Sequence, residues 1–379
     1  MIYLDNAATT WPKPWQISQA MVECIEKYGA NPGRSGHKLS LQAGSILLYT
    51  RELLCSLFNV QDPFEFIHTQ NCTDSLNIAI KGLLRANDHV ITSSMEHNSV
   101  VRPLMELKKQ GLEISFVKCS NEGILDPDDI RKEIKSNTRL IVTSHASNVT
   151  GTLLPISDIA SIAKDHGISY LVDAAQTAGS IPIDLSSLSV DLMAMPGHKG
   201  LLGPQGTGIL FIRKGTSLKQ LREGGTGSES ESLDHPQTRP DKYEAGTLNT
   251  PGIAGLGAGI KYILDNGQDC LHSKVKGLEK LLICALSQLR NVKIYGPRDM
   301  ACRSGIVSIN IGQMPSTELA DILDQKYDIA VRGGLHCAPM AHRTIGSLQQ
   351  GTVRLSLGPF NTIDQIKYTV RAIEEISRM

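Results

Sequence analysis

The sequence predicts an α/β protein in which a large domain, with a mainly parallel sheet between helices, is followed by a smaller α/β domain. Two observations support this class. Between about residues 64 and 213, strand patterns alternate with helical patterns, and the connections have the short length typical of α/β units. From residue 251 onward, helical patterns, strand patterns and a terminal amphipathic helix form a second set of elements.

The elements of the large domain follow from short apolar runs and from apolar residues at helical spacing. Asp126 and Pro127, for example, offer an N-cap and a first-turn proline for a helix that carries Ile130 and Ile134. Strands are predicted at residues 64–69, 89–95, 114–117, 140–144, 170–173 and 190–195, and helices at 76–84, 100–107 and 130–134.

After residue 213 the sequence predicts a long loop, followed by the smaller domain. Residues 215–250 are polar and rich in Gly and Ser, which predicts a loop at the rim of the site rather than a linker. Helices are predicted at 251–264 and 271–289, strands at 306–311 and 352–357, and a final helix with an apolar stripe at 366–376.

Composition excludes several classes of function. The 379 residues carry a formal net charge of zero, which gives no broad attraction to nucleic acid or to an anionic membrane. No apolar run approaches the roughly 18 residues of a spanning helix, and the N-terminus lacks a basic region before an apolar core, so a cytoplasmic protein is expected. The eight cysteines form no Cys-x-x-Cys pair and there is no His-Glu-x-x-His, so neither a metal site nor a disulfide framework is expected.

Lys199 and Asp173 are the residues that suggest a chemistry. Lys199 follows an apolar run and stands beside His198, and a lysine amine can condense with the aldehyde of pyridoxal phosphate. A buried carboxylate such as Asp173 keeps the pyridine nitrogen of that cofactor protonated. Either residue alone would be interpreted as a surface lysine or an ordinary strand-end carboxylate. Their combination predicts a pyridoxal phosphate site.

Further polar residues stand at the ends of the predicted strands. Ligands of open α/β sheets gather at the carboxyl ends of the strands. The residues expected at this edge are Thr73, His97, Asn148, Asp173 and Lys199.

Seven short motifs, in order along nearly the whole chain, resemble those of the cysteine desulfurases of the class V aminotransferase group. They lie at residues 4–10, 95–98, 147–151, 172–176, 197–199, 244–250 and 332–337. The interval between Cys337 and Arg354 resembles the branch related to sulfur-mobilising desulfurases and selenocysteine lyases. The resemblance implies a fold type I transferase with a seven-stranded type of sheet, a large domain at 15–255, and a small domain formed by 1–14 and 256–379.

The resemblance also implies roles around the cofactor. Lys199 would attach it and serve as the base for the Cα proton. Asp173 would hold the pyridine nitrogen, Gln176 would donate to the ring oxygen, and His97 would stack on the ring and relay protons. The rival interpretations are a water-facing glutamine and a structural core histidine.

The resemblance assigns the remaining residues to binding of the phosphate or of the substrate. Thr73, at a helix start, would bind the phosphate with His198, although a plain N-cap would give the same sequence. Cys72 stands beside it where the family commonly has threonine, and Thr247 would reach the phosphate of a neighbouring subunit, which requires a homodimer. The residues implied for the substrate are Asn148, which could also contact the ring oxygen, Arg354, which would clamp the carboxylate, and Arg332.

Cys337 distinguishes a desulfurase from a transaminase, because its thiolate could take sulfur from L-cysteine as a persulfide and leave alanine. His336 and Arg332 are expected to lower the pKa of Cys337, while Gly333 and Gly334 are expected to let its loop swing. The rival interpretation is an inert cysteine.

Alternative functions with the same cofactor are a selenocysteine lyase, another C–S lyase or a class V aminotransferase. A non-catalytic scaffold for sulfur transfer is the alternative from another class. A protein that accepts the sulfur is a possible partner.

Overall fold

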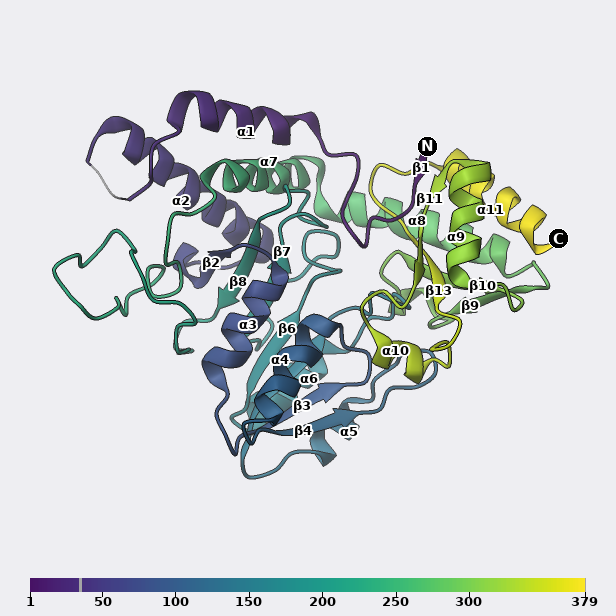
Figure 1. Cartoon of the computed structure of the whole chain (residues 1–379), viewed down its shortest axis with the longest axis horizontal. Coiled ribbons are helices and arrows are strands. Elements are labelled where there is room, and N and C mark those ends of the chain that lie inside the picture. Colours follow the sequence, from purple (N-terminus) through teal and green to yellow (C-terminus); the bar gives the residue numbers. More distant parts are fainter. Residues whose placement is uncertain (34–35, 379) are drawn as a thin grey trace.

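A computed structural model describes residues 1–33 and 36–378. Figure 1 shows two parts joined by long helices, with the larger part on the left and the smaller part on the right. The larger part contains a seven-stranded sheet in the order β2-β8-β7-β6-β5-β3-β4. Its strands are β2 (Phe66–Thr69), β3 (His89–Ser93), β4 (Glu113–Val117), β5 (Thr138–Ser144), β6 (Ser169–Asp173), β7 (Leu192–Pro196) and β8 (Gly208–Ile212).

This sheet is mainly parallel, as the sequence predicts. Neighbouring strands from β7 through β6, β5 and β3 to β4 are parallel, whereas β8 is antiparallel to both β7 and β2. The register pairs Ser144 with Asp173 and Asp173 with Ala194. The ends of β5, β6 and β7 therefore lie at one edge, which is where polar side chains can meet.

Helices cover both faces because alternate residues of each strand point to opposite sides. Tyr170 and Val172 of β6 belong to a core formed with α2, α6 and α7, whereas Leu171 belongs to a core formed with α3 and α4. The helices of this part are α1 (Trp15–Tyr28), α2 (Lys38–Phe58), α3 (Cys72–Leu83), α4 (Asn98–Lys108), α5 (Pro127–Lys132), α6 (Ile156–Asp165) and α7 (Thr250–Asn266).

The smaller part has an antiparallel sheet in the order β12-β13-β10-β9. Its strands are β9 (Val292–Tyr295), β10 (Ile306–Ile311), β12 (Arg332–Gly334) and β13 (Thr352–Ser356), and its helices are α8 (Gln268–Leu286), α9 (Ser316–Tyr327), α10 (Pro339–Thr344) and α11 (Ile363–Ser377). The N-terminal strand β1 (Ile2–Tyr3) pairs in parallel with β11 (Ile329–Ala330). This pairing supports the assignment of residues 1–14 to the small domain, but the domain boundaries stay a prediction.

The structure differs from the sequence expectations in its helices and agrees with them in one long loop. The predicted elements did not include α1 and α2, which pack against α7. The helix predicted to carry Ile130 and Ile134 spans Pro127–Lys132, so Ile134 lies beyond its end. Residues 213–249 contain no helix or strand, in agreement with the loop predicted at 215–250, and in Figure 1 part of this segment forms the wide teal loop at the left edge.

A loop at residues 147–153 ties the two parts together. Ser304 Oγ donates to the carbonyl of Gly151 at 2.9 Å, and Leu153 N donates to the carbonyl of Cys302 at 2.9 Å. Gly151 has a φ of +71°, and a Cβ at this position would lie 2.6 Å from the carbonyl oxygen of Ile306. Glycine is therefore required by both the backbone conformation and the close approach.

Candidate active site

A cavity of about 140 Å³ lies at the carboxyl ends of β5, β6 and β7. Parallel strands end at the same edge of the sheet, so residues far apart in the sequence meet here. The structure brings together in its lining the predicted residues Cys72, Thr73, His97, Asn148, Asp173, Gln176, His198 and Lys199.

Lys199 lies in the turn after β7 and is partly buried. Burial is the largest cause that lowers the pKa of its ammonium, and the positive charges of Arg354 and Arg332 lower it further. Its backbone carbonyl accepts a hydrogen bond from Thr10 Oγ1 at 2.8 Å, which fixes the turn. Lys199 therefore presents an amine that loses its proton more easily than an exposed lysine.

Asp173 ends β6 and is only 4% exposed. Its Oδ1 accepts hydrogen bonds from Ala175 N at 2.9 Å and from Cys72 Sγ at 3.5 Å. Burial raises the pKa of Asp173, while the Ala175 amide and the Lys199 charge act in the opposite direction. Its other oxygen has no donor among the described residues, so it is left for a proton donor inside the cavity.

His97 is the N-cap of α4 and stands next to the cavity. Its Nδ1 accepts a hydrogen bond from Ser99 N at 3.1 Å and lies 2.8 Å from Ser99 Oγ. Burial is the largest cause that lowers the pKa of His97 to about 4, and Lys199 adds to the effect. The imidazole is therefore neutral near pH 7.

A cofactor phosphate in this cavity would bind at the N-terminus of α3. Asn71 caps this helix by accepting from Asp74 N at 2.9 Å, and Thr73 lies in its first turn. His198 Nδ1 and Ser144 Oγ are buried and have no hydrogen-bond partner within the described residues. His198 and Ser144 both line the cavity, so these two polar atoms are available to a polar ligand there.

Pyridoxal phosphate fits this arrangement. A helix N-terminus favours an anionic phosphate. The amine of Lys199 and the carboxylate of Asp173 face the same cavity, and His97 borders it. The unpartnered polar atoms of His198 and Ser144 would be available for further contacts to it.

Gln176 and Asn148 already have protein partners. Gln176 Nε2 donates to the carbonyl of Ala7 at 3.3 Å, and Asn148 Nδ2 donates to the carbonyl of His336 at 2.7 Å. Both residues line the cavity, yet these bonds use part of their donor capacity. Asn148 therefore connects the cavity to the loop that carries Cys337.

Arg354 projects from β13 and is 1% exposed. Its Nη2 donates to Asp5 Oδ1 at 2.8 Å and its Nη1 donates to the carbonyl of Asn148 at 3.1 Å. The Nε of Arg354 is buried without a partner in the described part of the chain. The Nε of Arg354 is thus available to bind an anion, and the carboxylate of Asp5 balances the charge of the guanidinium.

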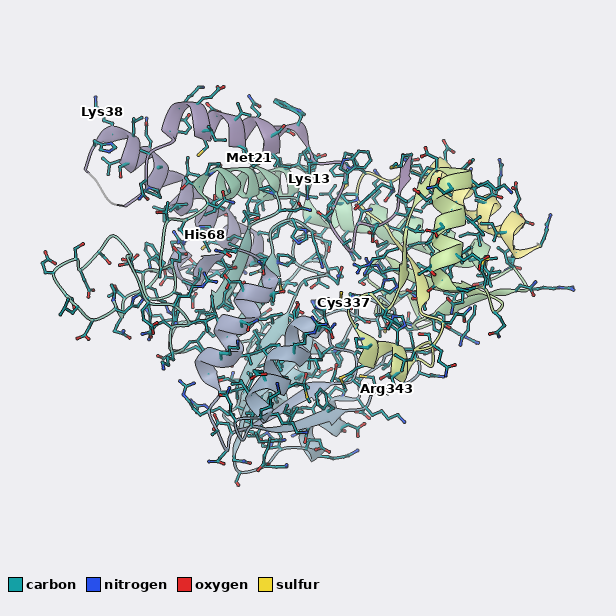
Figure 2. The ribbon with its side chains drawn as sticks, viewed as in Figure 1. Lys13, Met21, Lys38, His68, Cys337 and Arg343 are labelled. Atoms are coloured by element: carbon teal, nitrogen blue, oxygen red, sulfur yellow. The ribbon has the colours of Figure 1, made fainter. Side chains whose placement is uncertain are left out.

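Cys337 is exposed and lies between the two parts of the molecule (Figure 2). Its carbonyl accepts a hydrogen bond from Asn98 N at 2.8 Å, so the loop is attached to the first residue of α4. Arg332 Nη2 lies 3.8 Å from Cys337 Sγ. His336 and Cys337 have φ values of +51° and +58°, which shows that surrounding contacts hold both residues in a conformation that side chains disfavour.

The structure contradicts two expectations about this loop in part, at Gly333 and at His336. Gly333 pairs with Val353 inside the small sheet, and a Cβ there would lie 2.4 Å from the carbonyl oxygen of Ser316. This glycine permits close packing and gives no freedom to swing. The ring of His336 is buried, and burial lowers the pKa of His336 to about 2, so the ring is neutral and cannot stabilise a thiolate by charge.

Thr247 lies outside the cavity. It is exposed, and its Oγ1 accepts a hydrogen bond from Asn31 Nδ2 at 3.5 Å. Its predicted contact with a phosphate therefore depends on a second subunit.

Several residues at the site were missed in the sequence. Ser99, Ser144 and Asp5 contact or border the predicted residues, and Glu96 is fully buried beside His97. A signal existed for Ser99 and Glu96, because both stand within two positions of His97. Ser144 could be found only from the strand register, which places it opposite Asp173.

Among the described residues, no helix is long and apolar enough to span a membrane. No group of three or more His, Cys, Asp or Glu side chains that could hold a metal ion is found within 1–33 and 36–378.

Comparison with known proteins gives a consistent result over the full chain. The family model described as aminotransferase class-V matches residues 2–369. A probable cysteine desulfurase of Methanothermobacter thermautotrophicus is 36% identical over 100% of this chain and 95% of the relative. A cysteine desulfurase of Escherichia coli O157:H7 is 32% identical over 100% of this chain and 94% of the relative.

A solved structure agrees with these relatives. The apo cysteine desulfurase of Thermococcus onnurineus NA1 superposes with a TM-score of 0.93 and 34% identity, covering 100% of this chain and 94% of the other. The matches extend through the cavity and the Cys337 loop, since they cover the whole chain. The chain therefore belongs to the class-V aminotransferase family, in the group of the cysteine desulfurases.

Proposed function

We propose that this chain is a pyridoxal-phosphate-dependent cysteine desulfurase that converts L-cysteine into L-alanine and receives the sulfur on Cys337 as a persulfide. The observation that carries the proposal is the placement of an exposed thiol beside Arg332, on a loop bonded to the residue that follows His97. Family membership supports the cofactor and the reaction. The roles of the individual residues rest on the geometry above.

The cofactor supplies an electron sink that weakens the bonds at Cα and Cβ of the bound amino acid. Lys199, whose pKa is lowered by burial, is the base that takes and returns the Cα proton. Arg354 orients the carboxylate through its unpartnered Nε. His97 is neutral and lies against the cavity, where it can donate a hydrogen bond.

Cys337 takes the sulfur through its thiolate. The S–S bond forms as the Cβ–S bond of L-cysteine breaks, and the carbon gains the two electrons that the sulfur pair loses. The net reaction consumes one cysteine and one enzyme thiol and gives one alanine and one enzyme persulfide. Arg332 Nη2, at 3.8 Å, is the nearest recorded cation to the sulfur.

The test compares Cys337→Ala with Cys270→Ala, since Cys270 is also exposed but lies on α8. With L-cysteine and a reductant, Cys337→Ala should lose alanine and sulfide release while its cofactor absorbance stays intact. Cys270→Ala should behave as wild type, and mass spectrometry should find the extra sulfur on the Cys337 peptide. Full turnover by Cys337→Ala would overturn the persulfide route.

The attachment of the cofactor has a separate test. Borohydride reduction of the loaded protein should add the cofactor mass to the peptide that contains Lys199. An unmodified Lys199 peptide would refute the cofactor assignment.

Product analysis separates the alternatives. Desulfuration gives alanine, elimination gives pyruvate and ammonia, and transamination requires a keto acid. Selenocysteine in place of cysteine tests the lyase alternative, and a scaffold would show no change of the cofactor spectrum when L-cysteine is added.

We further propose a homodimer that acts in the cytoplasm and passes sulfur to an acceptor protein. Thr247 supports the dimer because it is exposed outside its own cavity. Apolar side chains on α1 also support it, since Trp15 is 67% and Ile25 62% exposed. Sedimentation of the loaded protein tests the dimer, and a monomer at working concentration would contradict it.

A further inference from the structure

The first turn of α4 connects three groups that the proposed reaction requires. His97 caps this helix, and Asn98 N donates to the carbonyl of Cys337 at 2.8 Å. Ser99, the next residue, lies in the lining of the cavity. The position of the imidazole, the thiol and the phosphate turn can therefore depend on one short segment.

The contacts of Ser99 decide where the proton of His97 resides. A backbone N–H can only donate, and Ser99 N lies 3.1 Å from His97 Nδ1. Nδ1 must therefore offer its lone pair and carry no proton. In a neutral imidazole the proton then resides on Nε2, which leaves that nitrogen as a donor.

The hydroxyl of Ser99 extends this contact toward the phosphate side. Ser99 Oγ lies 2.8 Å from His97 Nδ1 and 3.0 Å from Thr73 Oγ1. Thr73 is in the first turn of α3, where the cofactor phosphate is expected. One hydroxyl thus bridges His97 and the turn at which the phosphate would bind.

We propose that Ser99 is a positioning residue, which holds the imidazole of His97 in the tautomer protonated on Nε2 and couples the orientation of that ring to Thr73. The inference rests on the proposed function for its kinetic consequences, but the tautomer itself is a property of the folded chain. His97 then offers a hydrogen bond to the substrate and does not serve as the base.

The charged groups that face His97 also keep its ring neutral. Lys199 after β7, Arg332 on β12, Arg354 on β13 and Arg102 on α4 all disfavour a second proton on the ring. The neutral form therefore persists across the pH range in which L-cysteine turnover is measured.

The direct test is nuclear magnetic resonance of the cofactor-loaded, full-length protein with ¹⁵N-labelled histidine. The His97 signals are assigned by their loss in His97→Gln. Long-range proton–nitrogen correlations should show a protonated Nε2 and an unprotonated Nδ1 in wild type. A protonated Nδ1 would overturn the proposal, whether or not the protein releases alanine from L-cysteine.

A double-mutant cycle tests the coupling. Ser99→Ala keeps the backbone N–H but removes the bridging hydroxyl, and Ser99→Thr restores a hydroxyl. Losing one such hydrogen bond should lower kcat about fivefold with little change in KM. Thr73→Val removes the same contact together with any contact of its own to the phosphate, so Ser99→Ala should cost much less than about fivefold when it is made in the Thr73→Val background.

The outcomes separate the two proposals. Full activity of Ser99→Ala, or additive losses in the double variant, would refute the positioning role while leaving the desulfurase proposal intact. Rescue of kcat by Ser99→Thr would support the role, because a purely structural cap would alter thermal stability and not kcat. A wild-type protein that forms no alanine would instead refute the desulfurase proposal, and the tautomer measurement would still be decisive for His97.

Discussion

Glu96→Gln should make the protein more resistant to alkaline conditions. Glu96 is fully buried next to His97, where its Oε1 accepts from Ser93 Oγ at 2.5 Å and its Oε2 accepts from Ser144 N at 2.9 Å. Burial is the largest cause that raises the pKa of Glu96, from 4.5 to about 8, despite these hydrogen bonds, and Asp173 raises it further. The folded protein therefore holds a proton on Glu96 at neutral pH.

The sign of the effect on stability follows from proton counting. Between pH 4.5 and about 8, Glu96 is ionised in the unfolded chain and protonated in the folded chain. The folded state binds one more proton, so the free energy of unfolding falls as pH rises through this window, by about 1.4 kcal/mol per pH unit. Glutamine stays neutral and removes this dependence.

The measurement is denaturant unfolding of both proteins, loaded with cofactor, at about pH 5.5 and about pH 8.5. The difference in unfolding free energy, variant minus wild type, should grow by about 3 kcal/mol between these conditions. A hydrogen bond lost to the new amide gives a constant offset that cancels. Glu52→Gln, at an exposed position on α2, controls for the loss of one carboxylate. A difference that stays constant with pH would refute the buried, protonated state of Glu96.

Two further predictions concern packing and charge. Gly151→Ala should lower the unfolding free energy by at least about 2 kcal/mol and reduce turnover, because its Cβ would meet the Ile306 carbonyl at 2.6 Å in addition to left-handed strain of about 1–2 kcal/mol. Gly167→Ala, with open space at φ +64°, is the control and should lose only the strain energy, as measured by denaturant unfolding. Glu244→Ala should cost about 3–5 kcal/mol because it leaves Arg51 buried without its partner at 2.6 Å. Replacing both residues, as Arg51→Met with Glu244→Leu, should recover most of the loss, and equal losses for the single and double variants would contradict this reasoning.

Much of the fold could be predicted because each strand carries its own pattern. The strand at 306–311 was predicted with the bounds that β10 has, and the alternation from residue 64 to 213 indicated the parallel sheet. The helices α1 and α2 were missed although their residues pack against α7. Their burial depends on a helix about 200 residues later in the chain, which local periodicity does not reveal.

Some properties of the site residues could be predicted and others could not, again because local patterns do not show contacts between distant segments. Lys199 and Asp173 follow apolar strands, so the sequence itself places them at the sheet edge. Arg354 was predicted as a free clamp, yet its partnership with Asp5 joins residues at opposite ends of the chain. The packing of Gly333 against Ser316 was likewise invisible, and glycine was interpreted as flexibility.

The sequence by itself determined the fold class and the lysine and carboxylate pair, because these depend on residue type and on periods of a few residues, and its resemblance to a family pointed to the thiol at position 337. Only the tertiary structure decided which donors are already used, where His97 holds its proton, and why the Cys337 loop is attached to α4. Hydrogen bonds have fixed directions and short reach, so these properties arise only when distant segments are brought within about 3 Å of each other.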